Sequence, residues 1–213
     1  MVGIKSIVFL LALVVMTVLS SCDKGEISAD DFYAWHDNEE NGYHRITRLG
    51  DLQLDLKYLP LELLLFNEEN GQVMLASEKD SLKGLYMNNM NFVLTIGPAE
   101  DAKDKFDITK VGVANYDEFA ERALQLNFEM RDHITLRSGN RTWKAALCEM
   151  ENVYGLSFHR TFNIVFTPTE KLEELRNLEE FTLTVDDEIF GSGRTSFRFD
   201  RNQLAQVPTI IKR

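Results

Sequence analysis

Several short segments of this chain alternate apolar with polar residues, and this period of two restricts the fold more than any other feature of the sequence. Leu52, Leu54 and Leu56 alternate with polar residues, and the pattern recurs over 92–96 and 181–185. Successive side chains of a β-strand point to opposite faces, so such segments bury one face and expose the other. We therefore predict a mainly β fold, an antiparallel two-layer β-sandwich of seven to nine strands. The alternative is an α+β domain with its helices against one sheet.

Turn-forming residues predict how some strands are joined. Gly191-Ser192-Gly193 separates the strand over 181–185 from a segment around 197–199, so a hairpin is expected there. A second hairpin is expected around Ser138-Gly139-Asn140, with a loop longer than two residues. A single apolar run from Thr142 to Met150 follows that turn and is interpreted as its second strand.

A further strand is expected over 158–166. Its aromatic and aliphatic residues share one parity, and these are Phe158, Phe162, Ile164 and Phe166. This parity predicts that Phe158 faces the core. His159 then falls on the opposite face and is expected to be exposed to solvent.

Helices are expected to be short and only two or three in number. The clearest one follows Asn115, since Glu118 stands three residues on, at the spacing of a capping box. Apolar residues recur after Asn115 at helical spacing, namely Tyr116, Phe119, Ala120, Ala123 and Leu124. A second short helix is predicted from Thr167-Pro168-Thr169-Glu170, and one or two helical turns are predicted between Pro60 and Phe66.

The first 22 residues have the organisation of an export signal. Met1 to Lys5 carry one positive charge, and Ile7 to Leu19 form an apolar run broken only by Thr17. That run is shorter than the ~20 residues that span a bilayer, and its flanks are typical of a secretory signal that is later removed. The residues Leu19-Ser20-Ser21-Cys22 that follow resemble the lipobox of bacterial lipoproteins. The resemblance implies cleavage before Cys22 and acyl chains on its sulfur and its new amino group.

Beyond the lipobox, the chain resembles the small uncharacterised envelope lipoproteins that bacteria of the Bacteroidota carry in large numbers. The resemblance rests on the lipobox, the acidic residues after Cys22 and the aromatic, β-rich body. It implies a protein held in the cell envelope by its lipid, and we expect the membrane to be the outer membrane. No motif of that group transfers a function to this chain.

The chain is predicted to have three parts, which are a signal peptide (1–21), an acidic flexible tether (22–42) and a single β-rich globular domain (43–213). The tether is predicted because acidic residues, Gly, Asn and Ser dominate 23–42. Phe32, Tyr33 and Trp35 lie within it, so part of this stretch is expected to pack on the domain. Removal of the signal peptide from the 213-residue chain leaves 192 residues, enough for one domain with a real core.

The negative charge of the chain disfavours some classes of binding partner. The formal net charge of −11 becomes −12 without the signal peptide, because that segment contains Lys5 and no acid. Nucleic acid is disfavoured as a partner, since non-specific attraction to phosphates acts through Lys and Arg. Anionic lipid headgroups are disfavoured for the same reason, so the membrane link is expected to come from the acyl chains on Cys22 alone. A protein partner with a basic surface is favoured.

Three polar motifs are interpreted as structure rather than chemistry. Gly191 to Thr195 lies between two predicted strands and lacks the Lys of a phosphate-binding loop, so a hairpin turn is expected. Asp186-Asp187-Glu188 are adjacent, whereas a calcium loop spreads its carboxylates over alternating positions. His36, Asp37 and His44 lie in or near the predicted tether, which lacks the rigidity that a zinc site needs.

The cysteines offer one catalytic alternative. Cys22 and Cys148 are the only two, so an acylated Cys22 leaves Cys148 without a disulfide partner. Cys148 and His159 lie on consecutive predicted strands and could form a nucleophile–base pair. Cys148 stands in an apolar stretch, however, where a buried and inert thiol is normal. We expect that the protein is not an enzyme and that it has no metal site and no cofactor.

Three functions are considered. The leading one is a non-catalytic binding or assembly role in the envelope through protein–protein contacts, with edge strands able to accept a partner strand. The alternative is a solute- or glycan-binding lipoprotein, which needs a groove lined by aromatic residues and a few polar groups. An envelope hydrolase is third. Tyr58-Leu59-Pro60, Tyr86 and Asn88-Asn89-Met90-Asn91 are the candidate segments for an exposed functional patch.

Overall fold

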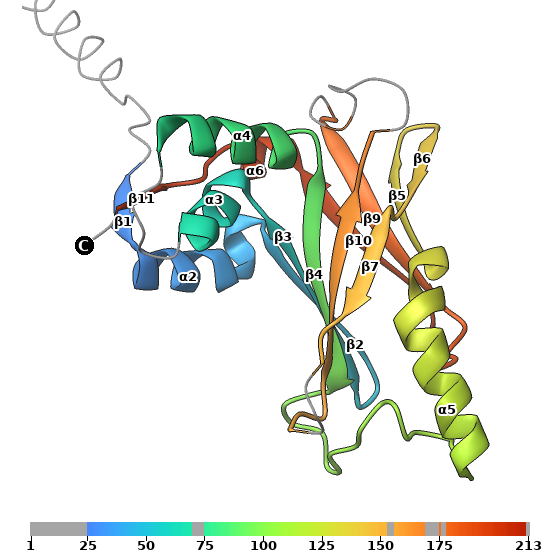
Figure 1. Ribbon diagram of the computed structural model, residues 1–213. Coiled ribbons are helices and arrows are strands. Elements are labelled where there is room, and N and C mark those ends of the chain that lie inside the picture. The colour runs from blue at the N-terminus through green and yellow to red at the C-terminus, as the bar shows by residue number, and fades with distance from the viewer. Residues whose placement is uncertain (1–24, 70–74, 153–155, 169–174, 176–177, 212–213) are drawn as a thin grey trace, which may run out of the picture.

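The computed structural model describes residues 25–69, 75–152, 156–168, 175 and 178–211. Two antiparallel sheets form the body, one group of helices lies at one end, and a further helix lies along one side (Figure 1). The prediction of a mainly β, sandwich-like fold is confirmed. The signal peptide, Cys22 and most of the helix predicted after Thr167 lie outside the described residues.

The larger sheet has five strands in the order β2-β3-β4-β8-β7, each antiparallel to its neighbours. The strands are β2 (His44–Leu49), β3 (Leu52–Leu59), β4 (Met90–Pro98), β8 (Arg160–Phe166) and β7 (Leu147–Met150). Residues selected by the alternation, such as Leu54, Phe92 and Phe162, are at most 1% exposed and belong to one core cluster. The period of two therefore identified the buried face of this sheet.

The smaller sheet has four strands in the order β10-β9-β5-β6. The strands are β10 (Gly193–Asp200), β9 (Glu180–Asp187), β5 (Ile134–Ser138) and β6 (Arg141–Lys144). Aromatic contacts join the two sheets, because the ring centroid of Phe92 lies 5.7 Å from that of Phe199 and 6.2 Å from that of Phe181. The core thus lies between the two layers.

The segment from Thr142 to Met150 is not one strand, as predicted, but two strands in different sheets. The amide of Ala145 still bonds to Ile134 O of the smaller sheet, whereas the amide of Ala146 bonds to Val165 O of the larger one. The chain therefore changes sheets within one residue. The hairpin before it is also tighter than expected, since Ser138 pairs with Arg141 and Gly139 adopts a positive φ of 55° in a two-residue loop.

The predicted orientations of Phe158 and His159 are wrong. Strand β8 begins only at Arg160, so Phe158 lies before the strand and is 50% exposed. His159 is half-buried and packs on Gly97, where an added Cβ would lie 2.3 Å from the imidazole ring. The parity argument failed here because it was extended beyond the end of the strand.

Five α-helices occur among the described residues, more than the two or three expected. They are α2 (Ala29–Asp37), α3 (Leu61–Glu69), α4 (Ala76–Tyr86), α5 (Tyr116–Leu124) and α6 (Arg201–Leu204), with 3-10 turns at Glu39–Asn41 (η1) and Met130–His133 (η3) and a π-helix at Gln125–Glu129 (η2). The helix after Asn115 is confirmed, and the Asn115 side chain accepts the Glu118 amide at 3.0 Å. Helix α4 was not predicted from the sequence, and none of its residues is buried.

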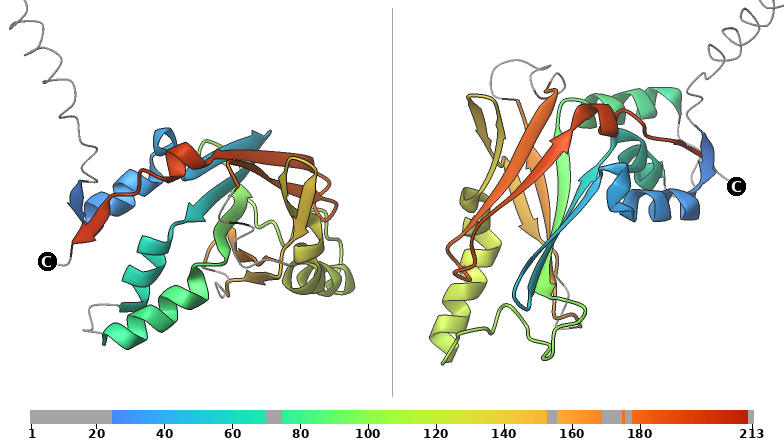
Figure 2. Two further views of the ribbon diagram at one scale, coloured as in Figure 1. Left: turned by 90° about the horizontal axis from the view of Figure 1, so that it is seen from above. Right: turned by 180° about the vertical axis from the view of Figure 1, so that it is seen from behind.

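The segment 26–42 is folded and is not a flexible tether. It contains β1 (Glu26–Ser28), α2 and η1, and β1 pairs in parallel with β11 (Thr209–Ile211), so the two ends of the described chain lie side by side (Figure 2). Phe32 is fully buried in a second core cluster with Tyr43, Leu63 and Val207. The aromatic residues thus outweighed the acidic composition, and the domain begins at Glu26 rather than at residue 43.

Among the described residues, none of the helices has the length and apolar character needed to cross a membrane.

Candidate functional site

A cleft of about 300 Å³ opens where the helices meet one end of the sandwich. Its walls come from the end of β3, the start of β4, helices α3 and α6 and the end of α4, which lie together at the upper end of the sheet in Figure 1. All three segments selected from the sequence contribute to it, namely Tyr58-Leu59-Pro60, Tyr86 and Asn89-Met90-Asn91. The volume of the cleft lies at the lower end of the range of small-molecule sites, ~300–1,000 Å³.

Rigid apolar residues form one side of the cleft. The Tyr58 ring lies 5.3 Å from Phe92 and 6.2 Å from Phe181 between ring centroids, so the sandwich core holds its orientation. Phe181 and Met90 line the same cleft and are 3% and 5% exposed. Aromatic walls fixed in this way offer a preformed flat surface to a ligand.

Polar residues belong to the lining of the same cleft. Asn91 is 8% exposed, and its side chain makes no hydrogen bond to another described residue. The same holds for the Tyr58 hydroxyl, and the Arg201 guanidinium forms no ion pair within the described part of the chain. Amide and guanidinium groups that line a cleft and are not engaged by neighbouring described residues are available to a ligand or to water.

Two opposite charges flank the Tyr58 phenol. Burial raises the pKa of Tyr58 to about 12, while the nearby Arg201 lowers that pKa and Glu62 raises it. Tyr86 donates a hydrogen bond of 2.5 Å to Glu68, and that carboxylate raises the pKa of Tyr86 to about 12. Both phenols are therefore neutral hydrogen-bond donors at physiological pH.

Sequence reasoning missed the contribution of Glu62 and Arg201. They stand about 140 positions apart in the chain, on α3 and α6, and meet at the cleft only through the tertiary fold. Neither belongs to a recognisable motif. Local sequence therefore contained no signal for their proximity.

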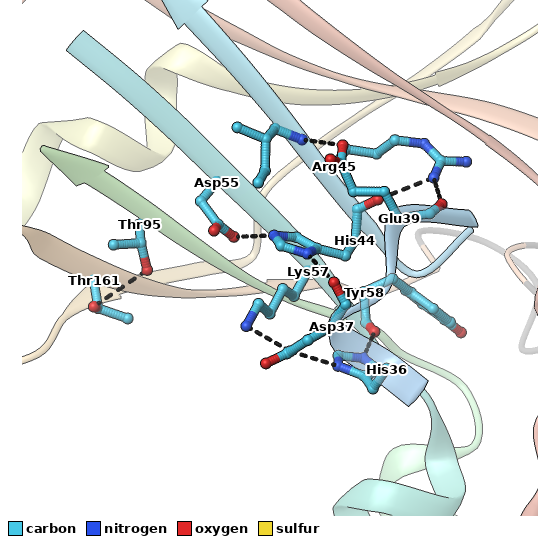
Figure 3. A network of polar contacts seen from close by, with 11 residues as sticks. His36, Asp37, Glu39, His44, Arg45, Asp55, Lys57, Tyr58, Thr95 and Thr161 are labelled. Atoms are coloured by element: carbon cyan, nitrogen blue, oxygen red, sulfur yellow. Dashed lines mark hydrogen bonds and ion pairs between the residues drawn. The ribbon is translucent and has the colours of Figure 1, made fainter. Parts of the chain in front are cut away.

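The histidine His44 lies behind the cleft in a polar network that ties α2 to the larger sheet (Figure 3). Its Nδ1 lies 2.7 Å from the Asp37 carbonyl oxygen and its Nε2 lies 2.8 Å from Asp55 Oδ1. The Asp37 carbonyl oxygen accepts a hydrogen bond, and the Asp55 carboxylate forms an ion pair with the protonated ring, so both neighbours favour the charged form. Burial lowers the pKa of His44, but the bonds to Asp55 and to the Asp37 carbonyl outweigh it and raise the pKa above its ordinary value.

The second histidine of the network behaves in the opposite way. His36 is 2% exposed, and its Nε2 lies 2.7 Å from the Tyr58 carbonyl oxygen. Burial lowers the pKa of His36, although that hydrogen bond opposes the shift. Lys57 and Asp37 form an ion pair of 2.7 Å beside it.

The structure brings His36, Asp37 and His44 together, but the two histidines have a structural role. A nitrogen of each imidazole bonds to a backbone carbonyl, and no group of three or more metal-ligating side chains occurs within the described ranges. These rings hold α2 against β3 rather than converging on a common point. The network thus supports the cleft from behind.

The acidic motif Asp186-Asp187-Glu188 and the glycine-rich motif Gly191 to Thr195 both lie at the β9–β10 hairpin. Asp187 is buried and accepts the amides of Phe190 at 2.8 Å and Ser192 at 3.0 Å, while Asp186 pairs with Arg194 at 2.5 Å. Each carboxylate is thus engaged by the turn that it precedes. Gly191 and Gly193 adopt positive φ values in that turn.

Cys148 and His159 are not brought together. Cys148 pairs with Ile164 across β7 and β8, and His159 stands five residues before Ile164, ~16 Å away at the rise of a strand. Cys148 is 8% exposed, and burial raises its pKa to about 12. The thiol is therefore protonated and poorly nucleophilic at neutral pH.

A second hollow, of about 590 Å³, lies over the outer face of the smaller sheet. Some of its polar groups bond to one another, since Thr184 Oγ1 lies 3.1 Å from Ser196 Oγ and Arg194 pairs with Asp186. Arg137 likewise donates to the Gly139 carbonyl oxygen at 3.1 Å. This hollow lies on the polar outer face of the sheet, whereas the smaller cleft is walled by the aromatic residues Tyr58 and Phe181.

No protein-family model matches the chain, and no curated protein matches it. Among solved structures, the chain is similar to a novel protein of unknown function from Burkholderia pseudomallei K96243. The two are 11% identical with a TM-score of 0.35, over 85% of this chain and 93% of that one. The site is therefore interpreted from its own residues.

Proposed function

We propose that this protein is a lipid-anchored protein of the cell envelope with a non-catalytic binding role, and that its cleft binds a small solute of the saccharide class. The observation that supports the proposal most is the cleft itself, where the sandwich core holds the Tyr58 ring and Asn89, Asn91 and Arg201 belong to the same lining. A sugar ring combines an apolar C–H face with many hydroxyl groups. The cleft offers the matching surfaces, an aromatic wall opposite amide, phenol and guanidinium groups.

The location follows from acylation at Cys22, which the lipobox implies. Strand β1 begins at Glu26, only four residues after Cys22, and a chain spans at most ~3.6 Å per residue. The β1–β11 end of the body is then held within ~14 Å of the acylated residue. This short link, and not a long tether, sets how far the cleft stands from the lipid, and two or more acyl chains make the anchor stable.

The test is a titration of isotope-labelled protein that begins at Asp23 with a panel of neutral and acidic mono- and disaccharides, followed by NMR. We expect shifts of the Asn89 and Asn91 side-chain amides and of the residues around Tyr58. Asn91→Leu keeps the volume but removes the amide, and we expect it to weaken binding about ten-fold. Asn163→Leu, on the same sheet but outside the cleft, is the matched control and should leave binding unchanged.

Two results would contradict the proposal. One is the absence of any shift at the cleft at millimolar saccharide. The other is an equal loss of affinity in Asn91→Leu and Asn163→Leu, which would show that the amide of Asn91 is not a contact.

Protein–protein contact is the second candidate function. It is favoured by an exposed apolar stripe on α5 and η2, where Tyr116 is 79% and Phe128 is 70% exposed. Isolated exposed apolar residues are common, but an aligned set marks an interaction site more often.

A further inference from the structure

The stripe consists of Tyr116, Leu124 and Phe128, which stand at intervals of eight and four residues along α5 and η2. Their exposed fractions are 79%, 57% and 70%. Residues four apart in an α-helix lie on nearly the same face but drift, because one turn holds about 3.6 residues. The π turn of η2 holds more than four residues, so the drift between Leu124 and Phe128 runs in the opposite sense, toward the Tyr116 side of the helix.

The stripe is exposed although the helix is firmly attached. Leu126 and Met130, at the end of the same segment, are 0% and 1% exposed and belong to the main core. Arg122 lies 5.1 Å from the centroid of the Phe190 ring and donates to the Ile108 and Val111 carbonyl oxygens. The body thus fixes the orientation of the helix and leaves the apolar stripe outside.

Acidic residues border the stripe. By helical spacing Asp117 and Glu121 lie next to the Leu124 side of the helix. The Glu118 carboxylate instead accepts hydrogen bonds from the helix start. The one basic residue of the segment 116–129 is Arg122, which is turned toward the body. A second copy of the chain would bring the same acidic border and a net charge of −12 against this one, and an anionic membrane would be repelled likewise. A basic partner is attracted, and its charges need not be buried.

We propose that the stripe docks a basic amphipathic helix of another envelope protein, whose apolar residues cover Tyr116, Leu124 and Phe128 and whose Lys or Arg side chains face the acidic border. Helix-against-helix docking of this kind uses apolar anchors at i and i+4 spacing. The inference rests on the second candidate function and is independent of solute binding in the cleft. Helix α5 lies at the end of the body away from β1 and β11 (Figures 1 and 2), so an anchor at Cys22 leaves it accessible to such a partner.

The experiment uses a fluorescent 14-residue peptide of Leu and Lys with helical amphipathic order, and a peptide of the same composition in scrambled order. The protein begins at Asp23, and fluorescence anisotropy measures binding at low and high salt. We expect the ordered peptide to bind and the scrambled one to bind at least ten times more weakly. Leu124→Ser with Phe128→Ser should weaken binding of the ordered peptide about ten-fold or more.

Two variants separate this result from other causes. Leu85→Ser changes an exposed leucine of α4, 66% exposed, and should alter affinity less than about two-fold, while Asn91→Leu tests the cleft alone and should leave peptide binding intact. Equal binding to the wild type and the double variant, no binding of the ordered peptide, or equal binding of both peptides would overturn the proposal. A dimer in light scattering that the double variant abolishes would overturn it as well, because it would assign the stripe to a second copy.

Discussion

Helices α2 and α5 begin in the same way, but the first aromatic residue of one is buried and that of the other is exposed. Each follows a side-chain cap, Ser28 or Asn115, and each has two acidic residues in its first turn. Phe32 of α2 is fully buried, whereas Tyr116 of α5 is 79% exposed. Local sequence therefore determines that a helix forms, and the elements packed around it determine whether its aromatic residues are covered.

The neighbours of the two helices explain the difference. Helix α2 lies among β1, β11 and α3, and Tyr43 and Leu63 close over Phe32. Helix α5 lies beside the body and continues into η2, and the core receives Leu126 and Met130 from beyond its end. One helix is thus part of a small second core, and the other presents a surface.

The largest expected effect concerns burial. Phe32→Ala should lower the free energy of unfolding by ~3–5 kcal/mol, because it removes a fully buried ring and leaves a cavity. The matched change Phe128→Ala removes a ring that is 70% exposed and should change stability by only ~0.5 kcal/mol. Urea unfolding of the two variants measures both, and equal losses would break the distinction between α2 and α5.

The next effect concerns the two histidines that bond α2 to the larger sheet, His36 and His44. Folding raises the pKa of His44, so its contribution to stability is full below its unfolded value of about 6.5 and is lost as the pH rises through the higher folded value. Folding lowers the pKa of His36, so its contribution is present above about 6.5 and is lost as the pH falls. Stability should therefore be greatest near neutral pH.

Single variants separate the two sides of that profile. His44→Gln should cost ~1–3 kcal/mol at pH 6, because Asp55 loses its charged partner, and should remove the decline on the alkaline side only. His36→Gln should remove the decline on the acidic side only. Urea unfolding from pH 5 to pH 9 measures both, and an unchanged alkaline decline in His44→Gln would show that another group controls it.

The smallest effect should be the same at both helices. Ser28 accepts the Asp31 amide at 3.2 Å, and Asn115 accepts the Glu118 amide at 3.0 Å. Ser28→Ala and Asn115→Ala should each cost about 1 kcal/mol, since a cap acts on its own helix whatever covers the rest. A cost several times larger for Ser28→Ala than for Asn115→Ala would show that the cap of α2 also supports its packing.

The sequence predicted what local patterns determine. It identified the faces of β3, β4 and β9 by their alternation and the start of α5 by Asn115. It did not predict that Tyr116 and Leu124 of α5 are exposed while the rest of its apolar side is half-buried, because a helical spacing does not show which residues another element covers. The change of sheet at Ala145 was hidden for a similar reason, since β6 and β7 read as one apolar run.

The cleft shows the same division. Tyr58, Tyr86 and Asn91 were selected from the sequence as polar and aromatic residues near turns, and they line the cleft. Arg201 and Glu62 were not, because only the tertiary fold brings α6 to α3. The aromatic residues of 26–42 predicted that part of this segment packs on the domain, but its acidic composition hid the helix α2 and the second core that Phe32 forms with Tyr43, Leu63 and Val207.

Both proposed binding surfaces act in the envelope only if the body is attached to a membrane. Intact-mass measurement of the protein purified from membranes of its own cells tests this attachment most directly. The account predicts a chain that begins at Cys22 and carries two or three acyl groups. A chain that still begins at Met1, or one with a free Cys22 thiol, would contradict it.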